Sequence, residues 1–264
     1  MNKVGIMQFV DSHAHIYSEK FRDDVHDVTS SSIDKGVNKI YMPNIDHESI
    51  DVMMELESRY PEVCISMMGL HPCSVKKGFE KDLYEVEEWL DKRPFAAVGE
   101  IGTDLYWDKS LFDYQKEAFK VQCNLALKHD LPVAIHCRES IDETIEILDS
   151  SEFEGLKGVF HCFTGSEEQA KRITEMGFKL GIGGVLTFKN SGVAEAIKNI
   201  AVDNLLLETD SPYLAPTPNR GKRNSPEYIP LIAQKLADVL ESPLEEIARL
   251  TTENSLKLFR SYEL

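Results

Sequence analysis

Short strand-forming runs alternate with segments of helical periodicity along the whole chain, and this alternation constrains the fold more than any other feature. Strands are expected at residues 8–13, 38–44, 64–71, 96–102, 131–137, 157–163, 178–184 and 204–210. Helices are expected at residues 23–35, 47–59, 80–91, 110–129, 140–150, 166–176, 191–200, 226–240 and 243–259. Eight such units in 264 residues predict a (β/α)8 TIM barrel of the α/β class, and the main alternative is an open, doubly wound sheet.

The charge and cysteine content limit the partners and the compartment. Acidic residues outnumber basic ones by 45 to 29, giving a formal net charge of −16, so the overall field repels polyanions and anionic membranes. Any nucleic-acid contact must therefore be local. The five cysteines form no C-x-x-C pair, and their odd number favours free thiols in a reducing compartment. With no linker, signal sequence or membrane-spanning stretch in view, we expect one cytoplasmic domain, residues 1–264, as a monomer or weak homo-oligomer.

Polar side chains occupy the expected C-terminal ends of the strands, where the catalytic residues of such barrels lie. They are His13 and His15, His71, Glu100, His136, His161 and Asp210. If residues 8–15 form a strand, Asp11, His13 and His15 share one face. That histidine pair alone also fits ordinary surface residues, and a single strand-end histidine fits a structural role. Several histidines that converge with two carboxylates on one barrel mouth predict a metal site instead.

Other chemically notable residues are assigned to different roles. Cys137 and Cys162 each follow a strand-end histidine directly, so alternation turns both thiols toward the helix layer, as part of the core. Asp11 and Glu208 each lie two residues before an expected ligand, and they either orient the ligands or are simply buried polar residues. Three further histidines fall within expected helices and are excluded from the site: His26, His47 and His129.

Seven stretches of the chain carry a resemblance to known proteins: DSHAH, GLHP, VGEIGTDLYW, LPVAIHCRES, GVFHCFTGS, GIGGVLTFKN and LLLETDSPYLAPTPNRGKRNSP. They resemble the TatD family of metal-dependent deoxyribonucleases, a branch of the amidohydrolase-like barrels, and the resemblance covers nearly the whole chain. It implies two divalent metal ions, one held by His13, His15 and Asp210 and the other by His136 and His161, with Glu100 as the bridge. Such mixed ligands suit Zn, Mn, Fe or Co and do not exclude Mg.

A two-metal site of this kind hydrolyses phosphodiesters. Asp210 is expected to act as the general base that accepts a proton from the attacking water. By the resemblance, His71 is expected to contact the leaving group or a phosphate, and the activity implied is that of a 3′–5′ exodeoxyribonuclease. The alternative is a small-molecule amide, lactone or phosphoester hydrolase on the same barrel. A scaffold that keeps its metals without catalysis is a third hypothesis.

Basic and aromatic residues near the strand ends are candidates for substrate binding. Arg220, Lys222 and Arg223 form a basic cluster within NRGKRNSP, and we expect them to approach substrate phosphates, unless they only solubilise the loop or pair with helix carboxylates. Weaker candidates for the same role are Arg138 and Lys189. Tyr106 and Trp107 are expected to stack a nucleobase at the rim or to pack in the core. Stacking would favour single-stranded or frayed DNA ends, because a duplex interior cannot present a base.

Overall fold

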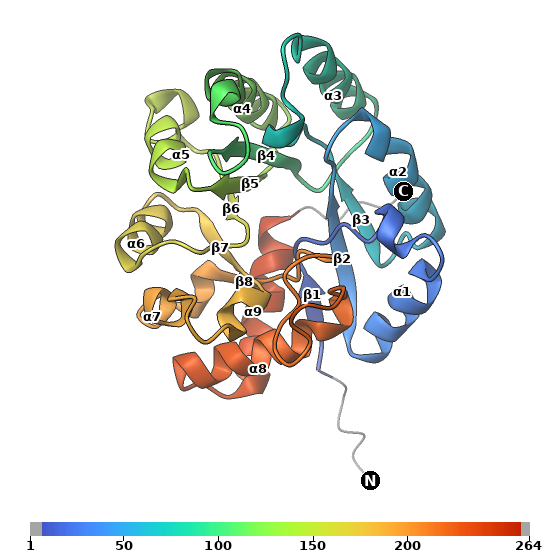
Figure 1. Cartoon of the computed structure of the whole chain (residues 1–264), viewed down its shortest axis with the longest axis vertical. Coiled ribbons are helices and arrows are strands. Elements are labelled where there is room, and N and C mark those ends of the chain that lie inside the picture. The colour runs from blue at the N-terminus through green and yellow to red at the C-terminus, as the bar shows by residue number, and fades with distance from the viewer. Residues whose placement is uncertain (1–6, 260–264) are drawn as a thin grey trace.

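The computed structural model describes residues 7–259 and shows parallel strands surrounded by helices (Figure 1). The strands are β1 (Phe9–Asp11), β2 (Val37–Pro43), β3 (Cys64–Met67), β4 (Val98–Asp104), β5 (Val133–Arg138), β6 (Gly158–Phe160), β7 (Lys179–Ile182) and β8 (Leu205–Leu207). The helices are α1 (Val25–Asp34), α2 (His47–Arg59), α3 (Glu80–Lys92), α4 (Phe112–Lys128), α5 (Ile141–Leu148), α6 (Glu167–Glu175), α7 (Val193–Ile197), α8 (Ile229–Leu240) and α9 (Leu244–Leu258). The predicted (β/α)8 barrel is confirmed.

The barrel consists of two parallel sheets that are joined at both of their edges by isolated bridges. Strands β1 to β3 form one parallel sheet and β4 to β8 another. An isolated bridge between Met68 and Val98 joins β3 to β4, and one between Ala14 and Ser211 joins the segments that follow β1 and β8. No helix among the described residues is both long and apolar enough to cross a membrane.

The first strand is shorter than the sequence predicts. It ends at Asp11, and Ala14 forms only an isolated bridge, so the alternation expected through His15 does not hold as one continuous strand. Beyond Asp11 the backbone bonds alternately to both neighbours, from Ser12 to Leu207 and from Ala14 to Tyr41, and the Asp11 carboxylate accepts from both the backbone N–H and the hydroxyl of Thr209. Backbone hydrogen bonds from Asp210 to His13 and from His15 to Ser211 then hold the bent chain beside the end of β8.

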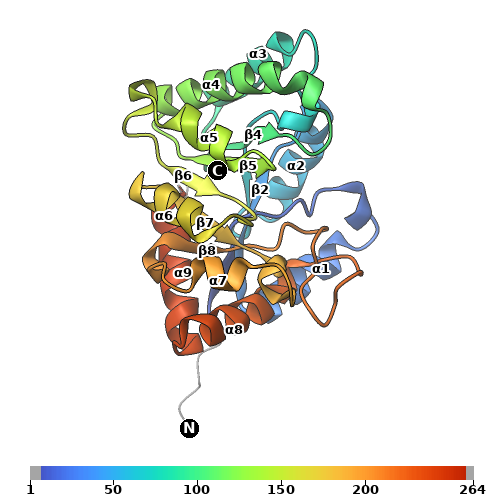
Figure 2. The ribbon, with the colours of Figure 1, turned by 60° about the vertical axis from the view of Figure 1, so that its left-hand side comes forward.

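The interior of the barrel is filled by apolar side chains from nearly every strand and is capped at its base by Phe259. The cluster comprises Val10, Tyr41, Ile65, Met67, Ala96, Ala97, Ala134, Val159, Leu206 and Phe259. Phe259 follows α9, which packs against β1 and β8, and its ring centroid lies 4.6 Å from that of Tyr41. The other end of the barrel is therefore the one open to polar residues. Figure 2 shows the loops that follow β1 and β8 lying near one another at the side of the barrel.

We expect Phe259→Ala to lower the free energy of unfolding by about 3–5 kcal/mol, because it removes a fully buried ring and leaves a cavity below the strands. Urea denaturation followed by circular dichroism measures this. Leu256→Ala shortens an exposed side chain on α9 and serves as the control, with an expected change of no more than about 0.5 kcal/mol. Equal effects of the two substitutions would contradict the role given to Phe259.

Candidate metal centre at the mouth of the barrel

Strands that fill the barrel with apolar side chains carry polar ones toward its mouth. On β5, Ala134 faces the interior and His136 lies two residues later on the same face. The same spacing relates Val159 to His161, which directly follows β6. The polar residues are thus placed by the same period of two that builds the core beneath them.

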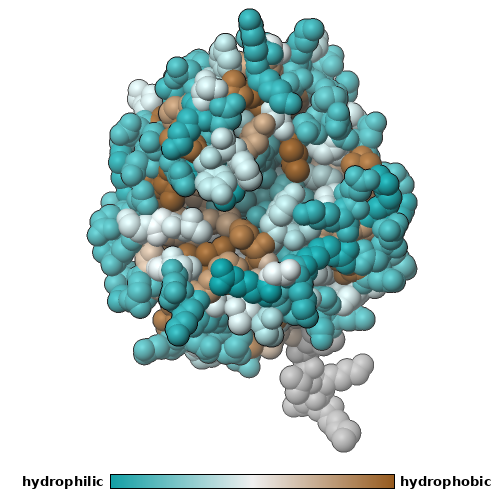
Figure 3. Space-filling model, in the orientation of Figure 1, coloured by the Kyte–Doolittle hydropathy of each residue, from teal (hydrophilic) through white to brown (hydrophobic). Residues whose placement is uncertain are grey.

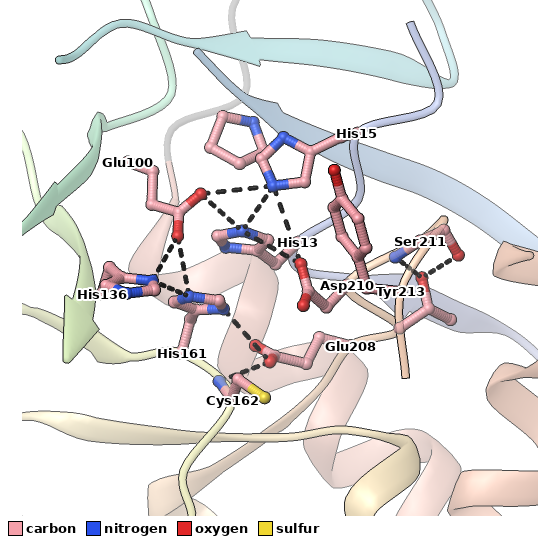
Figure 4. Close-up of polar contacts among 12 residues, drawn as sticks. His13, His15, Glu100, His136, His161, Cys162, Glu208, Asp210, Ser211 and Tyr213 are labelled. Carbon is pink, nitrogen blue, oxygen red and sulfur yellow. Dashed lines mark hydrogen bonds and ion pairs between the residues drawn. The ribbon is translucent and has the colours of Figure 1, made fainter. Parts of the chain in front are cut away.

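Glu100 lies at the centre of this polar layer and is 2% exposed (Figure 4). Its Oε2 atom lies 3.2 Å from Nε2 of His13 and 3.2 Å from Nε2 of His15. Its Oε1 atom lies 3.0 Å from Nδ1 of His136 and 2.9 Å from Nε2 of His161. Burial raises the pKa of the Glu100 carboxyl, but the surrounding histidines lower it well below its usual range. Each oxygen of one carboxylate therefore faces its own pair of imidazoles.

The backbone around Glu100 is adapted to bring it inward. The register between β4 and β5 shifts between Gly99 and Ile101, so Glu100 is the extra residue of a bulge, a feature common beside active sites. Gly102 follows with a φ of +141°, and a Cβ there would lie 2.0 Å from the carbonyl oxygen of His136. Only glycine fits this close approach of the two strands.

Asp210 completes the polar cluster from the end of β8. Its Oδ1 lies 3.7 Å from Nε2 of His15 and 3.9 Å from Nε2 of His13. Burial raises the pKa of the Asp210 carboxyl to about 6. Ligand atoms within 4.8 Å of one another form three groups, which are His13, His15 and Asp210; His13, Glu100 and His161; and His71, Glu100 and His136.

This donor set fits divalent metal ions. The Nε2 atoms of His13 and His15 lie 3.3 Å apart, and Nδ1 of His136 lies 3.3 Å from Nε2 of His161. Without a cation, one nitrogen of each pair must donate to the other, whereas a cation beside each pair could take both nitrogens as ligands. The carboxylates of Glu100 and Asp210 supply the negative charge that such cations require.

Two of the histidines are held in one tautomer by outer partners. The Nε2 atom of His136 lies 2.9 Å from Oδ2 of Asp104; a carboxylate only accepts, so this nitrogen donates, and in the neutral ring this leaves Nδ1 as the nitrogen that could bind a metal ion. The hydroxyl of Tyr17 donates to the carbonyl of Pro43 and lies 3.0 Å from Nδ1 of His15. It therefore accepts from Nδ1, which leaves Nε2 of His15 free to ligate.

Asp104 is a site residue that sequence reasoning missed. Burial raises its pKa, but the hydrogen bond from His136 and those from the backbone N–H groups of Trp107 and Tyr106 lower it to about 2. Burial lowers the pKa of His136, and the hydrogen bonds to Asp104 and Glu100 raise it above its usual value. The period of two along β4, from Glu100 to Asp104, was the available signal.

The structure supports the orienting alternative for both Asp11 and Glu208. Asp11 accepts from the N–H groups of His13 and Thr209, at 3.2 and 2.9 Å, and so ties together the two segments that carry ligands. Burial raises its pKa to about 8. Glu208 accepts from the backbone N–H of Cys162, and its Oε1 lies 3.5 Å from Nδ1 of His161. Asp11 thus holds the backbone of His13, and Glu208 lies beside the Nδ1 atom of His161.

His71 presents a donor to the centre. The backbone N–H of Cys73 donates to its Nδ1 at 3.0 Å, so in the neutral ring the proton is on Nε2, which lies 3.3 Å from Oε1 of Glu100. Burial lowers the pKa of His71, which favours this neutral form. The other three histidines belong to none of the ligand groups found among the described residues: His26, His47 and His129.

A cavity of about 630 Å³ opens above the cluster, and both Cys137 and Cys162 border it. The prediction that both cysteines belong to the core, away from the mouth, therefore does not hold for Cys162, which is in neither of the apolar clusters that the described residues form. Cys137 also packs against the apolar core, as expected, but Cys162 lies beyond the end of β6 with a φ of +48°, where strand alternation no longer applies. Figure 3 shows the molecule hollowed near its centre in the orientation of Figure 1, with hydrophobic and hydrophilic residues side by side around the hollow.

The rim residues predicted to bind substrate divide into two groups. Trp107 and Arg138 border the cavity, and the Arg138 guanidinium lies 3.6 Å from the centroid of the Tyr106 ring. Tyr106 and Trp107 are 46% and 70% exposed, so they are not core residues.

The basic cluster does not border this cavity. Arg223 is bonded to the Asp24 carboxylate and to the carbonyl of Lys20, at 2.8 and 2.6 Å, and its guanidinium lies over the Phe21 ring. Arg220 lies 4.4 Å from the centroid of the Phe188 ring. Lys189 and Lys222 are exposed side chains outside the lining of the cavity.

Comparison with known proteins identifies relatives of nearly full length. A family model described as TatD related DNase matches residues 10–260. The chain is 39% identical over 251 residues to the uncharacterized metal-dependent hydrolase YabD of Bacillus subtilis (strain 168), covering 95% of this chain and 98% of YabD. The crystal structure of YjjV, a TatD homolog from Escherichia coli K12, matches with a TM-score of 0.91 and 31% identity, covering 97% of this chain and 99% of YjjV. A phosphotriesterase homology protein from Escherichia coli shares the fold, with a TM-score of 0.70 at 11% identity and coverage of 97% and 100%.

We expect Asp104→Asn to weaken metal binding by about 10- to 100-fold. The Asn carbonyl can keep the bonds to Tyr106 and Trp107, but its NH2 group then faces Nε2 of His136 and favours the tautomer in which Nδ1 carries the proton. Titration of the metal-stripped protein with Mn²⁺ measures the affinity. Asp108→Asn, an exposed change in the same loop, is the matched control. Equal affinities of the two variants would show that Asp104 does not set the tautomer.

Proposed function

The chain belongs to the TatD related DNase family of metal-dependent hydrolases, and from this premise we propose that it hydrolyses phosphodiester bonds of DNA with two divalent metal ions. The observation that carries the proposal is the position of Glu100, whose two oxygens face two separate pairs of histidines. A bridging carboxylate between two ligand sets is the arrangement that a two-metal hydrolase requires.

The division of the ligands between the two ions is the one that the family implies, and the contacts of Glu100 are compatible with it. His13, His15 and Asp210 would hold one ion and His136 and His161 the other, with Glu100 shared between the two. When bound, the ions supply Lewis acidity, which lowers the pKa of water and offsets charge on the phosphate. The ligand chemistry suits Zn, Mn, Fe or Co, and Mg is also compatible.

Asp210 is proposed as the general base. Burial raises the pKa of its carboxyl to about 6, close to the range in which a base works best at neutral pH. The side chain is 13% exposed, so it borders both the cluster and the cavity through which substrate enters. A carboxylate at this place can take the proton of an attacking water as the phosphorus–oxygen bond forms.

Other residues are proposed to hold the substrate. The Nε2–H of His71 points to the cluster and can donate to a phosphate or leaving-group oxygen. Arg138 can neutralise a phosphate at the rim, and the exposed faces of Tyr106 and Trp107 can stack a base, which favours a single-stranded end. A role of Arg220 and Lys222 in phosphate binding stays a prediction from their charge. The proposed polarity, 3′ to 5′, rests on the family.

A small-molecule hydrolase is the second candidate, because a cavity of about 630 Å³ also has the size of an ordinary small-molecule site. An amide or lactone gains nothing from Arg138 at the rim, whereas a phosphoester does. The two classes therefore separate by substrate charge.

The first test is digestion of end-labelled single-stranded DNA by metal-stripped protein with and without added Mg²⁺ or Mn²⁺. We expect a metal-dependent ladder of single-nucleotide steps that begins at the 3′ end. His13→Ala, which removes a ligand of one ion, and an RNA of equal sequence are run beside it. Metal-dependent hydrolysis of a lactone or amide, with DNA left intact, would favour the second candidate.

Asp210→Asn tests the base. The substitution keeps the shape of the side chain but removes the proton acceptor, so we expect turnover to fall by about 10²- to 10⁴-fold while the melting temperature changes little. Asp203→Asn, an exposed change shortly before β8, is the matched control. Activity of Asp210→Asn equal to that of the control would refute the assignment.

A further inference from the structure

A second cation–aromatic pair lies across the mouth from Arg138 and Tyr106. The Nζ atom of Lys20 lies 4.6 Å from the centroid of the Tyr213 ring. Lys20 follows β1 and Tyr213 follows β8, whereas Tyr106 and Arg138 come from the ends of β4 and β5. In a barrel closed between β1 and β8, these two pairs of strands are on opposite sides.

Tyr213 belongs to the reaction cavity. The residue borders it and is 47% exposed, and its ring meets that of His15 edge-on at 6.5 Å between centroids (Figure 4). Its backbone N–H donates to the carbonyl of Asp210 at 2.8 Å. The ring is thus attached by one tight turn to the proposed base and leans against a proposed ligand.

Two adjacent residues hold the two halves of the pair. Arg223 donates to the carbonyl of Lys20 at 2.6 Å, and Asn224 donates to the carbonyl of Tyr213, also at 2.6 Å. Asn224 is fully buried and bonds the carbonyl of Thr209 as well, at 2.7 Å. Arg223 and Asn224 therefore fix the backbone of both Lys20 and Tyr213.

Lys20 keeps its charge available at this place. Its side chain is exposed, and none of the ion pairs found within residues 7–259 includes it. The neighbouring charges are already engaged, because Glu19 pairs with Arg22 and Asp24 pairs with Arg223. In a chain of net charge −16, an unpaired ammonium at the mouth is a local site for an anion.

We propose that Lys20 and Tyr213 form a nucleotide subsite on the β1 and β8 side of the mouth. A nucleobase stacks on the open part of the Tyr213 ring, and the Lys20 ammonium contacts the adjoining phosphate. The strand then runs from this subsite across Glu100 and Asp210 toward Arg138 and Trp107. The proposal rests on the proposed nuclease function, and Arg223 serves in it as a positioning residue.

The test compares kcat/KM for a short single-stranded DNA at several KCl concentrations in Mn²⁺. Loss of one phosphate contact should reduce the slope of log(kcat/KM) against log[KCl] by about 0.7, so we expect this reduction for Lys20→Met. The matched control is Lys92→Met, because Lys92 also lies over a ring, that of Trp89 at 5.4 Å, on the outer helix α3. Lys20→Met should lower kcat/KM for DNA far more than for bis(p-nitrophenyl) phosphate, which carries no second nucleotide, whereas Lys92→Met should change neither.

Tyr213 is tested with a conservative pair of variants. Tyr213→Leu should raise KM for DNA by about 5- to 100-fold with the salt slope unchanged, because stacking is lost and charge is not. Tyr213→Phe keeps the ring and should restore KM. If wild-type protein cleaves DNA but Lys20→Met and Tyr213→Leu behave like Lys92→Met, the subsite alone is overturned. If wild-type protein hydrolyses the small diester and leaves DNA intact, the nuclease function has failed and the subsite with it.

Arg223 is separated from a direct phosphate contact by a double-mutant cycle. If Arg223 acts through Lys20, Arg223→Gln should weaken DNA binding on its own but add nothing to Lys20→Met. Additive effects, with melting temperatures unchanged, would instead mean that Arg223 contacts a phosphate itself and would overturn its positioning role.

Discussion

The site depends on one buried carboxylate, Glu100, that lies among five histidines at the mouth of the barrel. A charge so deeply buried is tolerated only because every neighbouring imidazole can stabilise it, and these neighbours lower its pKa well below the usual range. The carboxylate is brought inward by a bulge in β4. The close approach of Gly102 to β5 lies at the same point of the sheet. Outer partners such as Asp104 and Tyr17 then decide which nitrogen each histidine presents. The geometry is therefore fixed in layers around Glu100.

Sequence reasoning predicted the parts of this site that follow from local periodicity. The strands, and with them His136 and His161, could be located because apolar residues two positions earlier mark the interior face of β5 and β6. It failed where the chain leaves regular structure. Cys162 has a positive φ beyond β6, and the backbone after β1 bonds to the segment around the end of β8, which is distant in sequence. The partner of Arg223, Asp24, is also far away along the chain, so no local pattern indicates that pairing.

Although the protein is acidic overall, two cationic side chains at the mouth of the barrel are not paired with any carboxylate that the structure describes. Lys171 and Lys198 pair with carboxylates three or four residues away along the chain. At the mouth, Arg138 and Lys20 lie over aromatic rings, and no ion pair found among residues 7–259 includes either of them. A cation over a ring is held in position while its charge stays accessible to an anion, whereas a cation paired with a carboxylate is largely neutralised. Aromatic partners therefore suit the proposed role of this surface, which is to attract phosphates despite a net charge of −16.

The segment from Asp210 to Asn224 carries both the proposed general base and a proposed substrate contact. It begins with the proposed base, turns at once to Tyr213, and returns to place Asn224 beneath the turn it has just made. Arg223 connects this unit to the loop after β1, which carries His13 and His15 at its start and Lys20 farther on. A displacement of either loop would therefore shift the proposed metal ligands and the proposed substrate contacts together. Such coupling would hold a bound substrate in a fixed position relative to the proposed ligands, which a mobile binding loop could not do.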